Sequence, residues 1–570
     1  MRDERIRETG EEITEKVWNQ YEKGVQFKQG LKLYDTVKVN EDFYLGKQWE
    51  GVQSNGLPTP VFNFIKLIVL FRVASTATDN LKINVSPLAS MAPADTTEIE
   101  TLCGVVKEQF EAIVEQNKLG KLVREFVRAA AVDGDSCFYS WFDPEVETGQ
   151  TAKGAIRTEI LENSRVIFGN PNTREVQVQP YIIVSRREML EDVRDEAKDN
   201  GCDPDEIIGD SDETNNRFDA MTDGKVTTLM RFRKDKKTGT IWAVKTVHGA
   251  VVRKEWDTGL KLYPIAWMSW EKVVNCCHGQ AIVTGLIPNQ VFVNKMFAMV
   301  MISLMTTAYP KVIYDKTCIT RWDNSVGKAI PVGNLNGRSL KDVAGTIDPA
   351  AISPQVSQFI ELAIRLTKEF SGATDAALGN VNPENTSAIL ATQKAAQVPI
   401  ELTRQDLHQA IEDLGTIWKD IMRVNYGTRY VEMPLTEQEK AVYAELGVPA
   451  PDKEMKTFDF SVLDTAPLAT KFDVGNGNYW SEIAQLNTLD NLLMNKQISL
   501  VDYLERIPAD FITNKQELID ALKAQSMPQT GGALDLGAPM AGMQIDPALS
   551  SGYNTLERKA TQQDALRLLQ

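Results

Sequence analysis

The residues best suited to metal chemistry are few in this chain of 570 residues, which has three histidines and six scattered cysteines. One run, Cys276-Cys277-His278, places three potential ligands side by side. Adjacent cysteines are poorly placed to share one tetrahedral zinc ion, and the sequence has no C-x-x-C or H-E-x-x-H motif that could complete a site. We therefore expect a structural role for this run, free thiols in a reducing compartment, and no metal ion.

The patterns of phosphate, calcium and acyl-transfer chemistry are also incomplete. A phosphate-binding loop needs G-x-x-x-x-G-K-[ST], whereas the nearest fragment, from Gly333 to Gly337, has the wrong glycine spacing and no lysine. The acidic run from Asp203 to Asp212 has Ile207 where a calcium loop needs a third oxygen ligand. The serines lack a neighbouring base or a nucleophile elbow. These observations predict that the chain is not an enzyme and binds no cofactor.

The charge balance limits which partners the chain could bind. Its 78 acidic residues outnumber its 62 basic residues, which gives a net charge of −16. A protein that grips phosphate over its whole surface needs clustered lysine and arginine, so this balance argues against such a function. It does not exclude DNA that must slide past the protein without sticking, because repulsion between like charges would then help.

Two apolar runs are candidates for buried or membrane-spanning helices. Met296–Tyr309 is 14 residues long, and Phe62–Ala74 contains Lys66 and Arg72. A membrane helix needs about 20 apolar residues. We therefore expect both runs to form buried helices and the chain to have no membrane partner.

The elements that position these residues change character along the chain. Apolar residues recur every three or four positions from Glu4 to Phe43, which predicts amphipathic helices, and Gly46 should end the last of them. From Asp135 to Leu262 the period becomes two, with turn signals between the apolar runs, which predicts antiparallel strands. A chain of this length should form two to four units, and we expect an α+β fold.

The stretch from Ile282 to Tyr426 has a more specific order. Asn289 should cap a helix that reaches about Thr307, and Ser353-Pro354 should begin a second helix after a segment of short strands and Gly/Asn turns. After a polar loop, a long helical pattern contains Pro399, which should kink it. The first helix is apolar on two faces, which predicts burial or packing against neighbours. These faces are Val293, Phe297, Val300 and Leu304 on one side and Phe292, Met296 and Met299 on the other.

This succession resembles that of the portal proteins of tailed bacteriophages over about residues 4–524. The similar phrases are Gly279-Gln-Ala-Ile, Ile287-Pro-Asn-Gln-Val-Phe-Val-Asn294, Gly372-Ala-Thr-Asp-Ala-Ala-Leu-Gly379 and Asn385-Thr-Ser-Ala-Ile389, with a further one from Asn40 to Trp49. The resemblance implies an α+β, portal-like subunit. Its parts would be an α/β wing, a two-helix stem, a β-rich clip, a long kinked helix and a helical C-terminal crown.

The resemblance also implies boundaries for these parts. Residues 1–278 would form the wing, with N-terminal helices followed by antiparallel strands, 279–308 the first stem helix, 309–352 the clip, 353–373 the second stem helix and 374–385 the tunnel loop. Residues 386–478 would form the kinked wing helix and closing strands, 479–525 the crown, and 526–570 a flexible C-terminal tail rich in Gly, Pro, Ala and Met.

A portal implies a homo-oligomeric ring, usually a dodecamer, at one capsid vertex, through which double-stranded DNA is packaged and ejected. The implied partners are the terminase large subunit, neck or adaptor proteins, and the major capsid and scaffolding proteins. The implied location is the virion, with the host cytoplasm during assembly. Clip candidates for docking or DNA exit are Lys311, Lys316, Arg321, Lys328, Arg338 and Lys341. The same segment contains four acidic residues, so it is locally net positive inside an acidic chain. Tunnel-loop candidates are Asp375, Gly379, Asn380, Asn382, Glu384 and Asn385.

Other interpretations stay open at this point. Another virion structural protein, such as a head–tail connector or a minor capsid component, would also be acidic and free of catalytic motifs. A connector is usually much shorter, and two helices flanking a clip would not be expected in it. A terminase-like enzyme would need a phosphate-binding loop and a metal-binding carboxylate cluster, and the sequence has neither. A nonviral helical scaffold is the remaining alternative.

Overall fold

The computed structural model describes most of the first 473 residues and little of the remainder. The described residues are 10–77, 82–87, 96–149, 152–210, 224–307, 311–347 without 324, 326 and 327, 354–373, 386–435, 443, 453–464, 468–473, 489, 493–494, 498–507 and 519. The chain forms two compact units, Met1–Ser481 and Glu482–Gln570. In the second unit, α13 (Leu500–Arg506) follows Ser499, and Ser499 and Asp502 cap it reciprocally.

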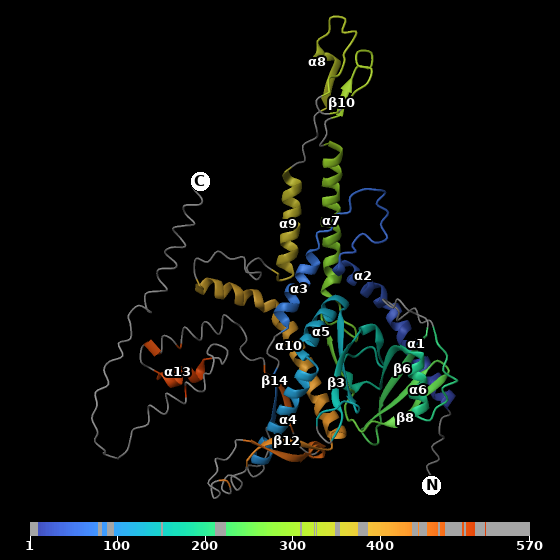
Figure 1. The fold of residues 1–570 in the computed structure, drawn as a ribbon, viewed down its shortest axis with the longest axis vertical. Coiled ribbons are helices and arrows are strands. Elements are labelled where there is room, and N and C mark those ends of the chain that lie inside the picture. The colour runs from blue at the N-terminus through green and yellow to red at the C-terminus, as the bar shows by residue number, and fades with distance from the viewer. Residues whose placement is uncertain are drawn as a thin grey trace, which may run out of the picture. The chain divides into compact units, whose positions relative to one another are not determined.

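Two antiparallel sheets dominate the middle of the first unit (Figure 1). One has the order β3-β2-β9, from β2 (Asp135–Asp143), β3 (Ala155–Leu161) and β9 (Ile265–Ser269). The other runs in sequence order through β4 (Val166–Phe168), β5 (Tyr181–Met189), β6 (Lys225–Lys234), β7 (Ile241–Val247) and β8 (Ala250–Asp257). Short 3-10 turns, η2 (Asn163–Arg165) and η3 (Val176–Val178), connect the strands. The antiparallel strands predicted from the period of two are confirmed, as is the α+β class.

Helices cover both faces of the five-stranded sheet. Helix α1 (Gly10–Gly30) packs Val17 and Tyr21 against one face, where Leu229 and Val244 are buried. Helix α6 (Leu190–Asp199) packs against the other face, where its buried Val193 contacts the other side of the same strands. Alternate residues of a strand point to opposite faces, so β6 and β7 contribute buried apolar residues to both covered faces.

The largest core is formed by helices around the β3-β2-β9 sheet. These are α2 (Leu33–Leu45), α3 (Phe64–Thr76), α4 (Thr96–Gln116), α5 (Leu119–Asp133) and α10 (Thr386–Asn425). Gly46 ends α2 with a φ of 94°, a left-handed conformation that glycine adopts without strain, as predicted. Beyond Pro399, apolar residues of α10 recur every three or four positions and are all buried, namely Leu407, Ile411, Leu414, Trp418 and Ile421.

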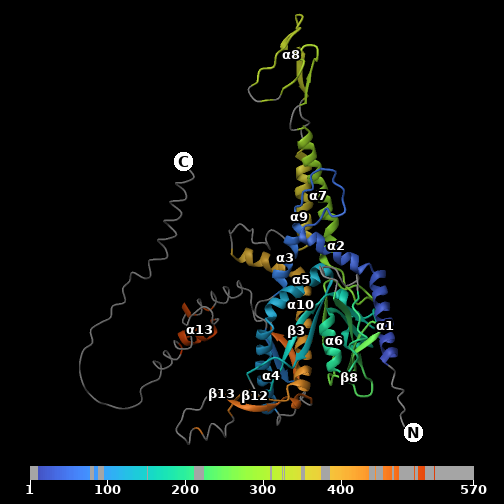
Figure 2. The same ribbon diagram turned by 45° about the vertical axis from the view of Figure 1, so that its right-hand side comes forward.

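Helix α10 is bent. Its first part runs at an angle to the remainder in both views (Figures 1 and 2). Pro399 lies inside this helix and has no amide hydrogen to donate, which removes one helical hydrogen bond and accounts for a bend. The kink predicted for this helix is therefore present in the structure.

Two further strand pairs complete this part of the chain. Strand β1 (Lys82–Pro87) pairs with β14 (Leu468–Asp473), and β12 (Thr428–Pro434) pairs with β13 (Lys453–Asp459). The strand-like sequence of Phe458–Leu463 forms a strand only at its start, because η4 (Phe460–Asp464) replaces the rest with a 3-10 turn. Phe460 and Leu463 turn into the core there, and their burial outweighs the local strand pattern.

Helix α7 (Ile282–Thr307) begins seven residues before the predicted cap at Asn289. Pro288 lies inside it and costs one backbone hydrogen bond. Packing of the first turns offsets that loss, because Val283 and Leu286 are buried in the largest core. Proline and asparagine together mimic a helix start in the sequence, and only the surrounding helices reveal that the helix has already begun.

The burial predicted for the apolar runs holds for only part of them. Helix α3 buries Ile65 and Ile68 but exposes Leu67 and Leu70. Within the described residues, one helix, at Ile282–Met305, has the length and apolar composition that crossing a membrane would require, and 28% of its apolar window is buried. The expectation that no helix is long enough is therefore wrong. Extending the helix back to Ile282 adds the missing length, and Lys295 is its one charged residue.

Candidate functional site

The six basic candidates lie in one small module, which we call the basic module and define as residues 311–347. Strand β10 (Lys311–Tyr314) pairs with β11 (Ala344–Ile347) at its base. The short helix α8 (Leu340–Val343) begins after Ser339, whose side chain forms a capping box with Asp342. Cys318, Ile319 and Val343 form its core. The module follows α7 and precedes α9 (Pro354–Phe370) in the chain (Figure 1).

Two of the basic side chains are neutralised within the module. Arg338 donates to Asp315 at 3.0 Å, and Lys328 donates to Asp323 at 2.7 Å. Hydrogen bonds from Thr317 hold the pKa of the Asp315 carboxyl below its ordinary value, and Arg338 adds to this effect. The hydrogen bond from Lys328 likewise lowers the pKa of Asp323. Both carboxylates therefore stay charged and keep these two bases paired.

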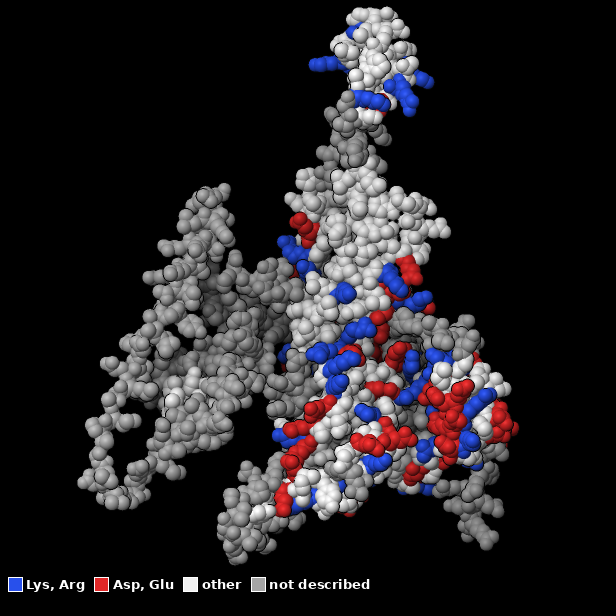
Figure 3. Space-filling model, in the orientation of Figure 1, with Lys and Arg blue, Asp and Glu red and all other residues white. Residues whose placement is uncertain are grey.

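Three basic side chains remain available to a partner. The side chains of Lys316, Arg321 and Lys341 are exposed and have no hydrogen bond or ion pair with another described residue. The third acid of the described module, Asp342, is used to cap α8. Figure 3 shows basic side chains on several sides of the module, with little acidic surface beside them. Such a surface suits carboxylates or phosphates held transiently, because exposed ion pairs contribute little stability.

The structure does not locate every candidate. The backbone of Lys311 lies in β10, but its side chain is outside the described residues. All six tunnel-loop candidates, Asp375, Gly379, Asn380, Asn382, Glu384 and Asn385, also lie outside the described residues. Among the residues that are described, no group of three or more histidine, cysteine or acidic side chains is arranged to hold a metal ion.

Helices α7 and α9, which flank the basic module in the chain, pack against each other. The rings of Phe292 and Phe359 meet edge-to-face with centroids 5.9 Å apart. Both helices nevertheless expose large apolar side chains. On α7 these are Phe292, Met299, Met301, Leu304 and Met305, and on α9 they are Phe359, Leu362, Leu366 and Phe370. Exposed apolar surface of this extent on a folded chain marks an interaction site.

The rest of the apolar sequence pattern on α7 is divided between the core and this surface. Of the predicted first face, Val293 is fully buried, whereas Leu304 is 49% exposed. Burial therefore decreases along the helix from its start toward the basic module. The prediction that a helix apolar on two faces packs against neighbours is met within the chain only near its start.

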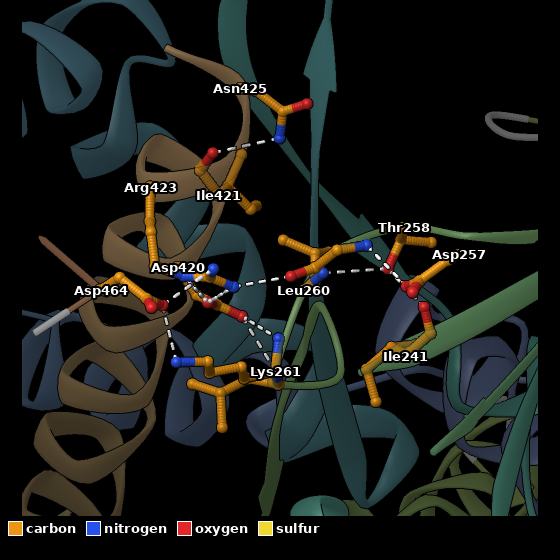
Figure 4. Close-up of polar contacts among 12 residues, drawn as sticks. Ile241, Asp257, Thr258, Leu260, Lys261, Asp420, Ile421, Arg423, Asn425 and Asp464 are labelled. Carbon is orange, nitrogen blue, oxygen red and sulfur yellow. Dashed lines mark hydrogen bonds and ion pairs between the residues drawn. The ribbon is translucent and has the colours of Figure 1, made fainter. Parts of the chain in front are cut away.

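A polar clamp that sequence patterns did not reveal fixes the second half of α10 (Figure 4). The Asp420 carboxylate accepts hydrogen bonds from the backbone amides of Lys261 and Leu262, at 2.7 and 3.0 Å. Arg423 donates to Asp420 at 2.9 Å and to the Gly259 carbonyl at 2.6 Å. The loop between β8 and β9 is therefore tied to α10.

A second carboxylate completes the clamp. Asp464 of η4 accepts from Lys261 Nζ at 2.7 Å and from Arg423 at 3.1 Å. The hydrogen bond and charge of Lys261 hold the pKa of Asp464 below its ordinary value. The sequence shows Asp420 and Arg423 as a possible helical pair three residues apart. Lys261, which binds Asp420, lies 159 residues away, and Asp464, which binds Arg423, lies 41 residues away, so neither contact leaves a local signal.

The run Cys276-Cys277-His278 lies just before α7 and makes structural contacts. His278 Nδ1 and Asp135 Oδ2 are 2.9 Å apart, and the other Asp135 oxygen accepts from the Gly279 amide at 2.8 Å. Burial lowers the pKa of His278, which keeps the ring neutral. Lys28 lies close by, fully buried, and donates to three backbone carbonyls of residues 163, 164 and 166. Burial lowers its pKa to about 7.

These contacts describe a chain with an exposed basic module, exposed apolar helix faces and polar connections between its elements. The model of one protein family matches it, and that family is described as "Phage P22-like portal protein". The match covers residues 184–465, which include β6 to β13, the basic module and helices α7, α9 and α10. No curated protein matches the chain.

Proposed function

Because the chain belongs, through residues 184–465, to the phage P22-like portal protein family, we propose that it is the subunit of a ring at one capsid vertex. Double-stranded DNA would pass through this ring during packaging and ejection. The observation that carries the proposal is the family match over the region in which two apolar helices flank a basic module.

The parts of a portal subunit correspond to the elements as follows. The sheets with α1 to α6 would form the wing, α7 and α9 the two-helix stem, and the basic module the clip. Helix α10 would be the kinked wing helix, and residues 479–525 would form the crown. The family match supports the assignments from β6 to β13, and the order of elements in the chain supports the wing before β6. The crown rests on the resemblance alone.

Ring assembly would bury the exposed apolar faces of the stem. A ring needs a heterologous contact, in which one face of each copy meets a different face of the next. Helices α7 and α9 each expose apolar side chains, so one chain offers two surfaces of the required kind. Membrane insertion of α7 is the alternative that its length and apolar composition would allow. We favour the ring because portals are ring-forming subunits and because α9 already covers part of α7.

DNA conduction and partner docking would use regions of opposite charge. The net charge of −16 suits a channel wall that repels phosphate, so that DNA moves without binding strongly. The basic module would then dock the terminase large subunit and later the neck or adaptor proteins, through Lys316, Arg321 and Lys341. We propose no enzymatic activity. Contacts with the major capsid and scaffolding proteins would place the subunit in the virion after assembly in the host cytoplasm.

The test is the mass of the purified chain in solution at increasing concentration, measured by mass photometry. The wild-type chain should assemble into one large closed species. A double variant in the stem, Met301→Lys with Leu366→Lys, should stay monomeric, because it places charges on the two faces that assembly would bury. The control is Lys237→Glu, at the turn between β6 and β7, which should assemble like the wild type. A wild-type chain that stays monomeric at all concentrations would contradict the proposal.

A further inference from the structure

Helix α7 presents two different faces to the elements around it. Phe292 contacts Phe359 of α9, whereas Phe297 contacts Phe62 with ring centroids 4.0 Å apart. Five helical residues correspond to a rotation of about 140°, so these two contacts lie on nearly opposite sides of the helix. Gln290, Asn294 and Met301 fall on the Phe297 side. Helix α9 therefore covers one side of α7, and the segment that contains Phe62 covers the other.

That segment is a loop of 16 residues, 47–62, between the end of α2 and the cap of α3, and we call it the strap (blue, beside α7 in Figures 1 and 2). Two buried amide side chains of α7 hold its ends. Gln290 donates to the Phe62 carbonyl at 2.8 Å, and Asn294 donates to Gln48 Oε1 at 2.6 Å. Gln290 also donates to Asn294 Oδ1 at 3.0 Å, which fixes the orientation of both amides.

Gln290 and Gln48 also complete the helix ends on either side of the strap. Gln290 Oε1 accepts from the Phe64 and Ile65 amides, which lie in the first turn of α3 and have no partner within that helix. Gln48 in turn donates to the Phe43 carbonyl near the end of α2. Gln290 and Asn294 are exposed by 0% and 2%, so water cannot replace them. The position of the strap therefore depends on these two side chains.

The strap turns apolar side chains outward. Val52, Leu57, Val61 and Phe62 are each exposed by 39% or more, which is unusual for four residues of one short loop. The strap has two charged residues, Lys47 and Glu50, and they balance. Trp49 Nε1 donates to the Pro60 carbonyl at 2.9 Å and closes the loop on itself. The strap is therefore a closed, neutral loop with an apolar outer surface.

We infer that the strap is a docking surface for the outer face of α9 in a second copy of this chain, and that Gln290 and Asn294 are the positioning residues that hold it in place. This inference rests on the proposed ring. Leu362, Leu366 and Phe370 of α9, next to Phe359 at the contact with α7, offer an exposed apolar surface of matching character. Since α9 and the strap flank α7 on nearly opposite sides, one copy can present α9 to one neighbour and the strap to the other, as a heterologous contact requires.

Continuity of the apolar surface from the strap onto α7 favours a second copy of this chain over an unrelated partner. Phe297 links the strap to α7, and Met301 and Leu304 continue the same apolar surface along α7 beyond the strap. Burying that face of α7 in a ring would bring the next copy over the strap as well. An acidic or basic partner would find one balanced pair of charges on the strap and little to recognise.

The test compares two kinds of variant. Gln290→Leu with Asn294→Leu removes the anchors, and Leu57→Glu with Val61→Glu keeps the anchors but places charges on the outer surface. The matched control is Asn117→Leu. Asn117 also makes three hydrogen bonds, to the Ile113 and Ile156 carbonyls and from the Thr158 amide, but it lies far from the strap in the chain. Hydrogen exchange of residues 47–65 reports whether the strap is held, and mass photometry reports the concentration at which rings form.

We expect the anchor variant to exchange faster at residues 47–65 and to need at least tenfold more protein to form rings. The outer-surface variant should keep wild-type exchange and show the same loss of assembly, while Asn117→Leu should assemble like the wild type. Normal assembly of the outer-surface variant would overturn the docking surface. Normal assembly of the anchor variant with fast exchange would overturn the positioning role. A wild-type chain that forms no ring would instead overturn the proposed function on which the inference rests.

Discussion

The clamp at Asp420 allows the most detailed prediction. Asp420 is 7% exposed and accepts two backbone amide hydrogens and two from Arg423. Hydrogen bonds to a charged group contribute about 1.5–3 kcal/mol each, and removing the acceptor leaves the donors without a partner. Water reaches part of this loop and reduces the loss. Asp420→Ala should therefore weaken the attachment of residues 258–264 to α10 by about 3 kcal/mol.

The assay is native-state hydrogen exchange of the peptide that spans residues 258–264. A global free energy of unfolding is poorly defined for a chain of two units, so a local measurement is preferable. A loss of about 3 kcal/mol corresponds to exchange faster by on the order of 100-fold. The control on the same helix is Asp406→Ala, which removes an exposed ion pair with Lys272 and should cost about 1 kcal/mol or less. Equal effects of the two substitutions would refute the clamp.

Three further predictions follow from other contacts. Reversing the charge of Lys316, Arg321 and Lys341 together should weaken pull-down of the terminase large subunit at least tenfold and leave rings intact. Lys328→Glu alone should weaken it less, because Lys328 already pairs with Asp323, and equal effects would contradict the division into paired and free bases. Trp418→Phe should weaken the local packing of β2 by about 1–3 kcal/mol, because it removes the indole donor to Ser140 and Thr158 from a fully buried site. Native-state hydrogen exchange of residues 135–143 measures this loss, and unchanged exchange would contradict the prediction. Burial lowers the pKa of His278, so on acidification the unfolded chain binds the proton before the folded chain does. The stability of the fold should therefore fall as the pH drops below about 6.5. The wild type should lose more stability between pH 7 and 5 than His278→Gln, and identical pH profiles of the two would exclude this cause.

Periodic patterns predicted the elements whose environment is uniform along their length. The strands between residues 135 and 262 and the seam of α10 are examples, because each is buried along most of its length. The end of α2 at Gly46 and the start of α13 at Ser499 were also predictable, since both depend on local chemistry of the capping residue.

The start of α7 was not predictable in this way. Pro288 and Asn289 form a strong local start signal, and the helix passes through them because Val283 and Leu286 are already packed in the core. The exposure of its later turns was equally hidden. A sequence shows that Met301 and Leu304 are apolar, but whether the covering surface belongs to the same chain depends on tertiary structure.

Only part of the candidate site could be predicted from the sequence. Its net positive charge was visible in composition, whereas the pairing of Arg338 with Asp315 links residues 23 positions apart and required the folded module. The anchors Gln290 and Asn294 were missed because buried amides on an apolar helix look like interruptions of its pattern. Their partners lie more than 200 residues away in the chain.

Electron microscopy of the purified full-length chain tests the central claim most directly. Images of negatively stained protein, at concentrations where mass photometry detects assembly, should show closed rings with a central hole as wide as duplex DNA. The stems of neighbouring copies should be in contact around the hole. Monomers alone, open filaments, or rings too narrow to admit a duplex would contradict the assignment of this chain as a DNA-conducting portal subunit.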